Sequence, residues 1–327
     1  MKIALVILNW NGRSLLEHYL PTVINYSKEA DVYVIDNAST DDSCAFLSQH
    51  YPQVKQIILD DNYGFAKGYN LGIRQIKAEV FCLLNNDVAV TENWLAPIRK
   101  QFKETSISIA QPLLLDYKKK EYYEYAGAAG GFIDRYGFPY CRGRIFNALE
   151  QVKEQYTTTN CFWATGACMF IRRSVWEALN GFDEDFFMHQ EEIDLAWRAF
   201  NAGYETQCIT NSIVFHQGAA SLKPSAQKTF YNHRNSLWML LKNVPTSSLT
   251  AVIFSRLVLD GFAAIHYLTK GQLRSFLMVL KAHFTVYASL RSTLKKRGKA
   301  TKRSDYYQHK NLPWQHFILR KNKFSDL

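Results

Sequence analysis

Two acidic residues directly follow apolar segments of the chain. Asp36 comes after the apolar run Val32–Ile35, and Asp87 ends the stretch NND at 85–87, which follows the wholly apolar run Val80–Leu84. A carboxylate flanked by amides at the end of a buried strand can offer its oxygens to a hard divalent cation that bridges a diphosphate. The alternative is an Asx turn at the strand end. The pattern favours a cation site at Asp87 and a ligand-binding role for Asp36.

A glycine-containing loop lies between these two acids. The stretch at 62–70 reads NYGFAKGYN, with Gly64 and Gly68 on either side of the aromatic Phe65. Glycines let a backbone approach a ligand closely, and a loop that opens a helix suits phosphates. Taken alone, Gly68 could equally serve a tight turn. The loop is a candidate for binding a ligand that has a flat ring and phosphates.

The first 115 residues alternate between predicted strands and helices. Strands are predicted at Ile3–Leu8, Val32–Ile35, Ile57–Leu59, Val80–Leu84 and Ile107–Leu115, and helices at Ser14–Tyr26, Asp41–His50, Gly68–Lys77 and Trp94–Glu104. Wholly apolar strands between helices indicate an α/β fold with a parallel sheet covered on both faces. Such sheets bind ligands at the carboxyl ends of their strands, where Asp36 and Asp87 fall. No G-x-G-x-x-G follows the first strand, which disfavours a dinucleotide-binding fold.

The rest of the chain divides near Pro245. Residues 117–160 are rich in Tyr, Gly and Arg, and they are followed by a strand-like run at Cys161–Arg172 and a helix at Ile193–Asn201. From about residue 248 the sequence is apolar at helical spacing. We therefore expect a domain at 1–244 and a helical, basic region at 245–327.

The carboxyl-terminal region combines an apolar stripe with a basic run. Arg256, Asp260 and Lys281 interrupt its apolar stretches, so no window has the ~18 uninterrupted apolar residues of a membrane span. The pattern predicts peripheral attachment to an acidic membrane face, with packing on the first domain or on a second subunit of an oligomer as the open alternative. The stripe comprises Leu273, Phe276, Leu277, Leu280, Phe284 and Tyr287, and six of the nine residues at 295–303 are Lys or Arg.

The composition is that of a globular protein with a basic excess. The 327 residues are 47% hydrophobic and 21% charged, with a formal net charge of +10, which excludes a disordered or low-complexity chain. A basic balance favours anionic partners. The six cysteines form no C-x-x-C pair or metal-ligand cluster, which indicates a reducing compartment and hence a cytoplasmic location. The apolar run at the start is too short for a signal peptide.

Four stretches, in order and spacing, resemble glycosyltransferase family 2, and most closely its bacterial rhamnosyltransferase-like members. They read NWNG at 9–12, VIDNASTD at 34–41, NYGFAKGYN at 62–70 and LNND at 84–87. The resemblance covers roughly residues 1–240. It implies a GT-A fold, in which helices flank a mostly parallel sheet, here with a C-terminal helical extension. It also implies a nucleotide-sugar donor (dTDP- or UDP-linked), a divalent cation (Mn²⁺ or Mg²⁺) and inversion at the anomeric carbon.

The resemblance also assigns donor and metal residues. The stretch NND at 85–87 stands in the place of the family's metal-binding D-x-D; only the last acid is present, so Asp87 is the expected metal ligand. His216 matches a position where histidine can reach the metal or the diphosphate, and its alternative is an ordinary polar residue after a strand. The implied donor-binding residues are Asn9, Asn11, Asp36, Asn62, Gly64, Phe65, Lys67, Asn70 and Asn86.

The resemblance continues on the acceptor side. The stretch GACMFIRR at 166–173 resembles the strand beside the sugar and the acceptor, and Trp163, Gly166 and Ala167 are the acceptor-side candidates. The stretch EEIDLAWR at 191–198 corresponds to E-D-x-D-L-x-x-R, whose second acid is the candidate general base. Here that residue is Glu192, with Glu191 as its rival. Asp194 is a third catalytic candidate, but it lies four residues before Arg198 on a helix, and we favour a structural ion pair between them.

The resemblance thus implies a metal-dependent, inverting glycosyltransferase of surface polysaccharide synthesis, with a saccharide or polyprenyl-linked acceptor. Glu192 would take the acceptor's proton, and a cation at Asp87 would stabilise the departing nucleoside diphosphate. One alternative is a basic nucleic-acid-binding protein, although no RRM, KH or helix-turn-helix pattern is present, and we expect no nucleic-acid partner. Another is a nucleotidyltransferase on a related sheet, whose glycine-rich opening loop with Lys or Arg is missing here.

Overall fold

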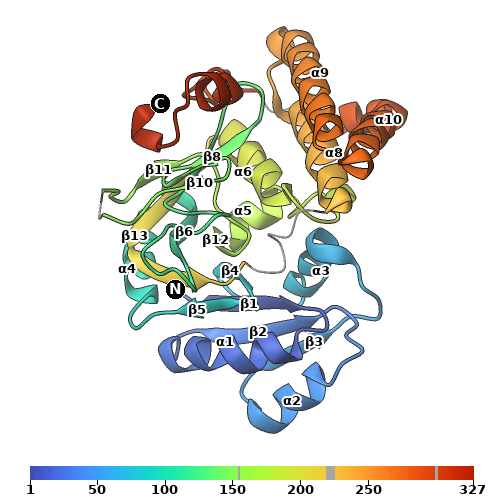
Figure 1. The fold of residues 1–327 in the computed structure, drawn as a ribbon. Helices are drawn as coiled ribbons and strands as arrows, with labels where there is room; N and C mark the ends of the chain where they lie inside the picture. Colours follow the sequence, from blue (N-terminus) through green and yellow to red (C-terminus); the bar gives the residue numbers. More distant parts are fainter. Residues whose placement is uncertain (154, 219–224, 299–300) are drawn as a thin grey trace.

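The computed structural model describes residues 1–153, 155–218, 225–298 and 301–327. Its centre is a nine-stranded sheet in the order β11-β13-β6-β12-β4-β1-β2-β3, with β5 paired to β13. The α/β prediction is confirmed (Figure 1). The strands of this sheet are β1 (Ile3–Asn9), β2 (Asp31–Asp36), β3 (Lys55–Ile58), β4 (Val80–Asn85), β5 (Val88–Val90), β6 (Ile107–Asp116), β11 (Thr159–Cys161), β12 (Cys168–Arg172) and β13 (Glu205–His216).

The amino-terminal half of the sheet is parallel. Strands β1, β2, β3 and β4 pair in parallel, and antiparallel β12 lies between β4 and β6. In this register Asn9 pairs with Asp36, and Leu8 pairs with Asn85. The polar residues that follow β1, β2 and β4 therefore meet at one edge of the sheet, as predicted. The helices of this half are α1 (Arg13–Tyr26), α2 (Ser43–His50), α3 (Gly64–Ile73) and α4 (Leu95–Gln101).

Two predicted elements differ from the structure. The helix predicted at Gly68–Lys77 is α3, which begins four residues earlier, because Gly64 adopts φ +73° and lets the loop turn directly into the helix. The strand-like run predicted at Cys161–Arg172 is two strands. β11 ends at Cys161 and β12 begins at Cys168, and they pair with different neighbours of the sheet. The loop between them carries Gly166 and Ala167.

A small antiparallel sheet fills the stretch in which the sequence indicated no regular structure. Its strands are β7 (Gly131–Ile133), β8 (Pro139–Cys141), β9 (Arg144–Ile145) and β10 (Ala148–Leu149). A Cβ at Gly131 would lie 2.0 Å from the ring of Trp163, so only glycine fits beneath that ring. After β12 the chain forms α5 (Arg173–Ala178), a short turn at Glu184–Phe186 and α6 (Glu191–Asn201), which begins two residues before its predicted start.

The carboxyl-terminal region is helical, as predicted, but its last residues return to the main body. Helices α8 (Ala226–Asn243), α9 (Thr246–Thr269) and α10 (Leu273–Lys295) stand at one corner of the molecule (Figure 1). The expected boundary at 244/245 falls at the turn between α8 and α9, and α8 also packs against α6. Beyond α10, Tyr306 stacks near Trp197 with ring centroids 4.7 Å apart, and the backbone N–H of Leu312 donates to Asp134 at 2.9 Å.

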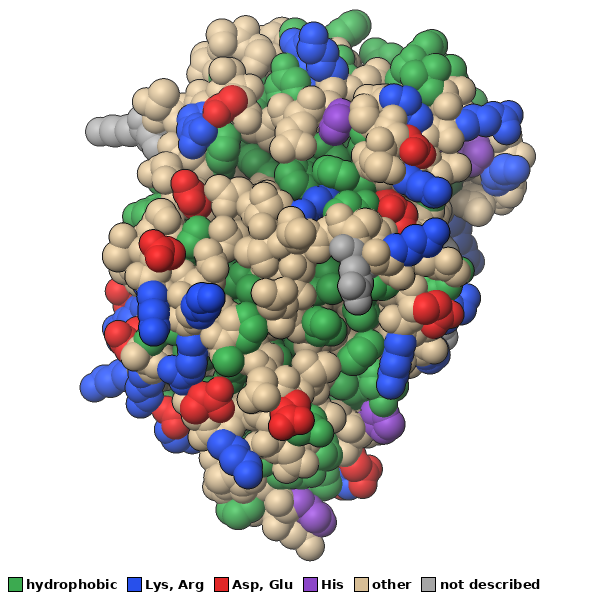
Figure 2. All heavy atoms as spheres, turned by 90° about the vertical axis from the view of Figure 1, so that its left-hand side faces the viewer, with side chains coloured by type: hydrophobic (Ala, Val, Ile, Leu, Met, Phe, Trp, Pro, Cys, Tyr) green, Lys and Arg blue, Asp and Glu red, His purple; other side chains and the backbone are tan. Residues whose placement is uncertain are grey.

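Among the described residues, helix α9 is long and apolar enough to span a membrane. Its 18-residue window has a mean hydropathy of 1.6, and 22% of that window is buried. The sequence test missed this because Arg256 and Asp260 interrupt the apolar run without lowering its average far. Elsewhere the surface is mixed. On the face drawn in Figure 2, acidic and basic side chains are interspersed, as on an ordinary solvated surface.

Candidate active site

Side chains at the ends of β1, β2 and β4 form one hydrogen-bonded group. The amide Nδ2 of Asn9 donates to Asp36 Oδ2 at 3.3 Å, and Asn86 Nδ2 donates to Asn9 Oδ1 at 2.9 Å. A Cβ at Gly12 would lie 2.3 Å from Asn9 Oδ1, so glycine is required beside this group. Asn11, at φ +49°, accepts from the backbone of Thr40 at 2.7 Å and joins the two strand-end loops. The structure thus brings together four of the donor-side candidates.

The loop at 62–70 is held against the segment that leads into α6. Asn62 Oδ1 accepts from Asn37 at 2.9 Å and from the backbone of Gly64 at 3.0 Å. A Cβ at Gly64 would lie 2.5 Å from the Phe187 ring, and the backbone N–H of Phe65 donates to the Phe187 carbonyl at 2.9 Å. The donor loop and the helix with the glutamates are therefore positioned by direct contact.

Two further candidates of this loop have different surroundings. Lys67 lies partly exposed, with its Nζ 4.2 Å from the centre of the Tyr63 ring. Asn70 is buried, donates to the Phe182 carbonyl at 2.9 Å and accepts from the Phe182 N–H at 3.0 Å. The protein thus uses both ends of the Asn70 amide, which indicates a positioning role. Sequence reasoning overlooked Asn37, although it follows Asp36 directly.

Asp87 and His216 lie side by side, and a third residue completes the group. His216 Nε2 is 3.0 Å from Asp87 Oδ1, and His216 Nδ1 is 3.0 Å from Glu124 Oε1. Burial would lower the pKa of His216, but the charges and hydrogen bonds of Glu124 and Asp87 raise it to about 10. Burial would raise the pKa of Asp87, yet His216 holds it below its usual range. The two acids thus favour the protonated form of the His216 imidazole.

Asp87 is the residue of this group whose chemistry suits a divalent cation, because both ring nitrogens of His216 already face carboxylates. Mg²⁺ at nucleotide phosphates is commonly held by one or two carboxylates, with phosphate and water oxygens as its other ligands. Asp87 offers such a carboxylate, and His216 offers an imidazole once it has released its shared proton. Glu124 was not predicted, because nothing in the tyrosine-rich stretch EYYEY at 121–125 signals its contact with His216.

The two adjacent glutamates begin α6 and are both buried at their carboxylates. Glu192 is half-buried as a residue, and its Oε2 accepts no hydrogen bond from any residue that the structure describes. Burial raises the pKa of Glu192 to about 7. Glu191 is 4% exposed, and burial together with the Glu192 charge raises its pKa well above its usual range. Glu192 is therefore the carboxylate that can gain and lose a proton near neutral pH.

The backbone ahead of these glutamates is strained. Phe187, His189 and Gln190 all have positive φ, between 62° and 69°, a region that non-glycine residues rarely adopt. The amide of Asn235, on α8, stabilises this turn by donating to the carbonyls of Phe186, Met188 and His189 at 3.2, 2.8 and 2.7 Å. Strained backbone of this kind persists where the surroundings hold it in place, often at functional sites.

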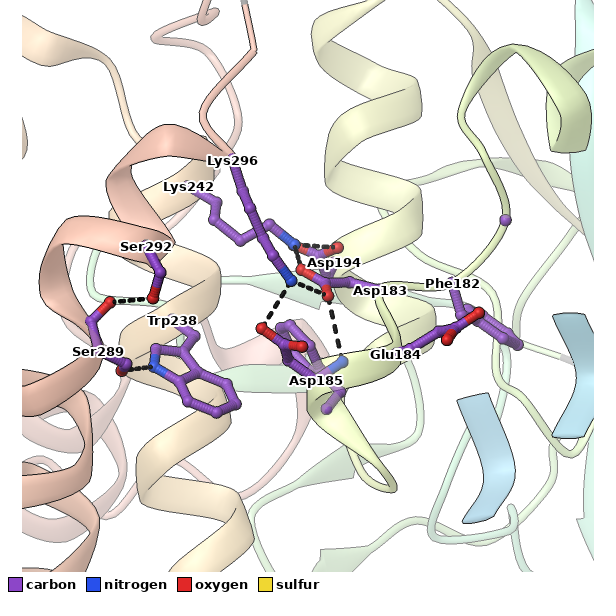
Figure 3. A network of polar contacts seen from close by, with 12 residues as sticks. Phe182, Asp183, Glu184, Asp185, Asp194, Trp238, Lys242, Ser289, Ser292 and Lys296 are labelled. Carbon is purple, nitrogen blue, oxygen red and sulfur yellow. Dashed lines mark hydrogen bonds and ion pairs between the residues drawn. The ribbon is translucent and has the colours of Figure 1, made fainter. Parts of the chain in front are cut away.

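Asp194 belongs to a structural network, as we favoured from the sequence. It is fully buried and accepts from Arg198 Nε at 2.8 Å and from Asn243 Nδ2 at 2.9 Å. It also accepts from Lys242 Nζ at 2.8 Å (Figure 3). Burial alone would raise its pKa, but the charges of Lys242 and Arg198 lower it. With both oxygens engaged, Asp194 is positioned to hold α6 against α8 rather than to accept a proton.

The acceptor-side candidates separate into one pair at the site and one core residue. A Cβ at Gly166 would lie 3.3 Å from the Phe65 ring and 3.9 Å from the Cβ of Glu192. The carbonyl of its neighbour Ala167 accepts from the backbone of Asn85 at 2.9 Å, which links this loop to the turn before Asp87. Trp163 is 2% exposed, and its indole N–H donates to the Phe132 carbonyl at 2.9 Å, so it supports the small sheet from within the core.

A cavity of about 340 Å³ lies beside the start of α6. The carbonyl of Asn232, in its wall, accepts from Gln190 at 3.3 Å. Burial, and then the charge of Lys228, lower the pKa of His189 to about 4. Its lining comprises Tyr125, Asn147, Ser225, Lys228, Thr229, Asn232, His233 and Tyr267.

Curated relatives are enzymes of glycan synthesis by name. The N-acetylglucosaminyl-diphospho-decaprenol L-rhamnosyltransferase of Mycobacterium tuberculosis is 25% identical over 252 residues, which are 69% of this chain and 79% of that protein. The low-salt glycan biosynthesis hexosyltransferase Agl10 of Haloferax volcanii is 25% identical, over 68% of this chain and 75% of its own. The O-antigen biosynthesis protein RfbC of Myxococcus xanthus is 26% identical over 60% of this chain. The match spans only 16% of the length of RfbC.

Solved structures and a family model agree with these relatives. GalNAc-T7, solved with UDP, GalNAc and Mn²⁺, matches with a TM-score of 0.61 at 15% identity. The match covers 89% of this chain and 57% of the GalNAc-T7 chain. The mannosyltransferase PcManGT from Pyrobaculum calidifontis, solved with GDP-Man and Mn²⁺, has a TM-score of 0.53 at 12% identity, over 90% of this chain and 84% of its own. They show the GT-A fold. The family model described as glycosyl transferase family 2 matches residues 4–179. The chain therefore belongs to glycosyltransferase family 2 and is a glycosyltransferase of GT-A fold.

Proposed function

We propose that this protein is a metal-dependent, inverting glycosyltransferase of surface glycan synthesis. It transfers a sugar from a dTDP- or UDP-linked donor to a hydroxyl of a saccharide carried on a polyprenyl diphosphate. The observation that carries the proposal is the proximity of Gly166 to Phe65 and Glu192, because it brings together the donor loop, the acceptor-side loop and a buried carboxylate whose Oε2 accepts no hydrogen bond from a described residue. The named activities of the relatives and the Mn²⁺ complexes of the structural neighbours support the same chemistry.

The chain's residues divide the work as follows. Asn9, Asp36 and the loop at 62–70 hold the nucleotide at the carboxyl edge of the sheet. Asp87, with His216 as second ligand and Glu124 behind it, would hold a divalent cation. When bound, this ion offsets the negative charge of the leaving nucleoside diphosphate. Glu192 accepts the proton of the acceptor hydroxyl as that oxygen bonds to the anomeric carbon and the diphosphate leaves.

The cavity beside α6 is the proposed place of the acceptor's diphosphate. Lys228 supplies positive charge and Ser225 supplies a hydroxyl, whereas the Thr229 hydroxyl already donates to the Ser225 carbonyl at 3.3 Å. Its wall residue Asn232 contacts Gln190, two residues before Glu192, so a saccharide attached to the diphosphate can extend toward the base. Lys228→Gln should raise the KM for a diphosphate-linked acceptor about tenfold and leave the KM for the donor unchanged.

The test is nucleoside diphosphate release from a panel of nucleotide sugars, with Mn²⁺ and a polyprenyl-diphosphate saccharide as acceptor. Asp87→Asn keeps the shape of the side chain but removes its charge, so we expect Mn²⁺-supported release to fall at least 100-fold, roughly, in a folded protein. Release of pyrophosphate from a nucleoside triphosphate and a sugar phosphate would indicate a nucleotidyltransferase instead. Unchanged turnover of Asp87→Asn, with unchanged metal dependence, would refute the metal site.

A further inference from the structure

Helices α9 and α10 expose large apolar side chains along one face of each helix. The most exposed include Phe254, Phe262 and Ile265 on α9 (68%, 66% and 58%) and Leu277, Phe284 and Tyr287 on α10 (48%, 70% and 52%). We call these six residues the apolar face. Successive members are three, seven or eight residues apart, which places the members of each helix on one side of it.

The opposite side of α9 is buried and carries both apolar and charged residues. The buried residues of α9 are Val252, Arg256, Asp260 and Ala264, so two of its four buried residues are charged. Asp260 Oδ1 lies 2.9 Å from Arg256 Nε and 3.1 Å from His233 Nδ1, and its Oδ2 lies 3.2 Å from His283 Nε2. His233, Asp260 and His283 have the spacing of a metal site. Arg256 already neutralises the carboxylate, however, and the group ties α8, α9 and α10 together.

This arrangement inverts the usual one for a helix that faces water, whose charged side chains point outward. Here the charges of α9 are inside, and its phenylalanines are outside. Exposed apolar patches of this kind mark contacts with a protein or a membrane.

The charge of the same region favours a membrane over a protein as the partner. From Gly261 to Ser304 the sequence contains no Asp or Glu. Lys270, Arg274 and Lys281 are exposed at the turn between α9 and α10 and along α10. The basic run at 295–303 is partly used within the molecule: Lys296 pairs with Asp183 and Asp185, Arg297 donates to carbonyls of Leu241 and Val244, and Arg303 pairs with Asp305. Lys299 lies outside the described residues.

We infer that the apolar face lies on an anionic phospholipid surface, with α9 and α10 in the plane of the interface. The phenylalanines and leucine enter the boundary of the acyl chains, and Lys270, Arg274 and Lys281 bind lipid phosphates. A second copy of this chain fits less well, because its own face brings the same basic residues and no acidic partner. A span through α9 would place Arg256 and Asp260 in hydrocarbon without their two histidines. The inference is independent of the proposed transfer reaction.

The experiment is flotation of the full chain with vesicles of phosphatidylglycerol and phosphatidylcholine, compared with vesicles of phosphatidylcholine alone. We expect flotation only with the anionic vesicles, and release as the salt concentration rises. The double variant Phe254→Ser/Phe284→Ser should weaken binding at least about tenfold. Its control is Tyr26→Ser/Ile58→Ser, which removes two exposed residues (43% and 67%) on α1 and β3, at the end of the molecule opposite α9 and α10 (Figure 1).

A second pair of variants tests the charges. Lys270→Gln/Arg274→Gln/Lys281→Gln should weaken binding on the order of 100-fold, because each cation near an anionic surface contributes about fivefold. Lys103→Gln/Lys118→Gln/Lys119→Gln, three exposed lysines elsewhere, should not. Turnover with a water-soluble acceptor is measured for every variant, so that loss of membrane binding and loss of activity are separate readouts.

Three outcomes overturn the inference. The wild-type chain could fail to float at any salt concentration. The variants of the apolar face could convert a dimer to a monomer in sedimentation without any vesicle binding, which would assign the face to a second copy. Resistance of the bound chain to alkaline carbonate extraction would indicate a span rather than an interfacial contact.

Discussion

Glu192 and Glu191 are neighbours in the sequence but differ in what their carboxylates can do. The pKa of Glu192 is raised to about 7 by burial, whereas burial and the Glu192 charge raise that of Glu191 further. The raised pKa of Glu192 lies near the working pH, where a base is most effective. Glu192 remains the predicted base, with Glu191 as its rival.

The first prediction concerns the pH dependence of turnover. A base works in its ionised form, so kcat should rise with pH through about 7 and level off above it. Glu192→Gln should lower kcat on the order of 100-fold or more and remove this rise, with donor binding little changed. Glu191→Gln is the matched control and should keep both the rise and most of the activity. If Glu191→Gln were the inactive variant, the roles of the two residues would be reversed.

The second prediction assigns Asp194 to stability. Asp194→Asn removes the negative charge that pairs with the buried Arg198 and Lys242. This loss should lower the free energy of unfolding on the order of 3 kcal/mol. Because the pKa of Asp194 is lowered in the fold, its contribution is present above about pH 4 and is lost as the pH falls below that. Urea denaturation at pH 7 measures the loss, and kcat of the folded fraction should stay within about threefold. A catalytic Asp194 would give the reverse result.

At the scale of elements, the loop between β11 and β12 brings the acceptor side to α6. Its Gly166 has ordinary φ, so alanine is compatible with its backbone. The added Cβ would meet Phe65 at 3.3 Å and Glu192 at 3.9 Å. Gly166→Ala should therefore reduce kcat/KM for the acceptor about tenfold or more, because it fills the space between the donor loop and the base.

This third prediction has a built-in control. A Cβ at Gly261, on α9, meets no atom within 4 Å, so Gly261→Ala should leave turnover unchanged. Both variants should keep the free energy of unfolding within about 1 kcal/mol. Equal kinetics of the two variants would show that the gap at Gly166 is not used by the acceptor.

The elements show what the sequence could and could not predict. The strand ends with Asn9, Asp36 and Asn86 were predictable, because parallel strands place their carboxyl ends at one edge. The small sheet was not, because strands of two or three residues have no measurable periodicity. Glu124 and Asn235 were missed for another reason. Each acts through contacts with residues far along the chain, and such contacts follow from packing rather than from local pattern.

At the scale of the whole molecule, α8 connects the glutamates to the carboxyl-terminal helices. Asn235 on α8 holds the strained turn before α6, and His233 on the same helix contacts Asp260 of α9. Tyr267 of α9 lines the cavity that Asn232 of α8 joins to Gln190. A bilayer in contact with the apolar face would therefore lie against the helices that border the proposed acceptor cavity. This arrangement suits an acceptor whose lipid stays in the membrane during transfer.

A second connection between these regions is the contact of Lys296 with the loop before α6. Lys296 Nζ lies 2.6 Å from Asp183 Oδ1 and 2.6 Å from Asp185 Oδ2, while Lys242 Nζ lies 2.6 Å from Asp183 Oδ2 (Figure 3). Burial would raise the pKa of Asp183, but the two lysines lower it to about 2. The carboxylate of Asp183 thus joins the loop before α6 to the end of α10, on the side of α6 that faces α8.

The last prediction is that Lys296→Gln loosens α10 without unfolding the protein. The lysine is 37% exposed, so solvent screening limits its contribution to about 1 kcal/mol or less, and Lys242 still neutralises Asp183. Amide hydrogen exchange should quicken in the final turns of α10 and at 183–186, where the contact is lost, while the sheet keeps its protection. Lys295→Gln, which removes an exposed charge one residue earlier, is the control and should leave exchange at 183–186 unchanged. If both variants behaved alike, the Lys296 contact would not hold α10 in place, and other contacts such as Trp238 with Ser289 and His283 with Asp260 would hold it.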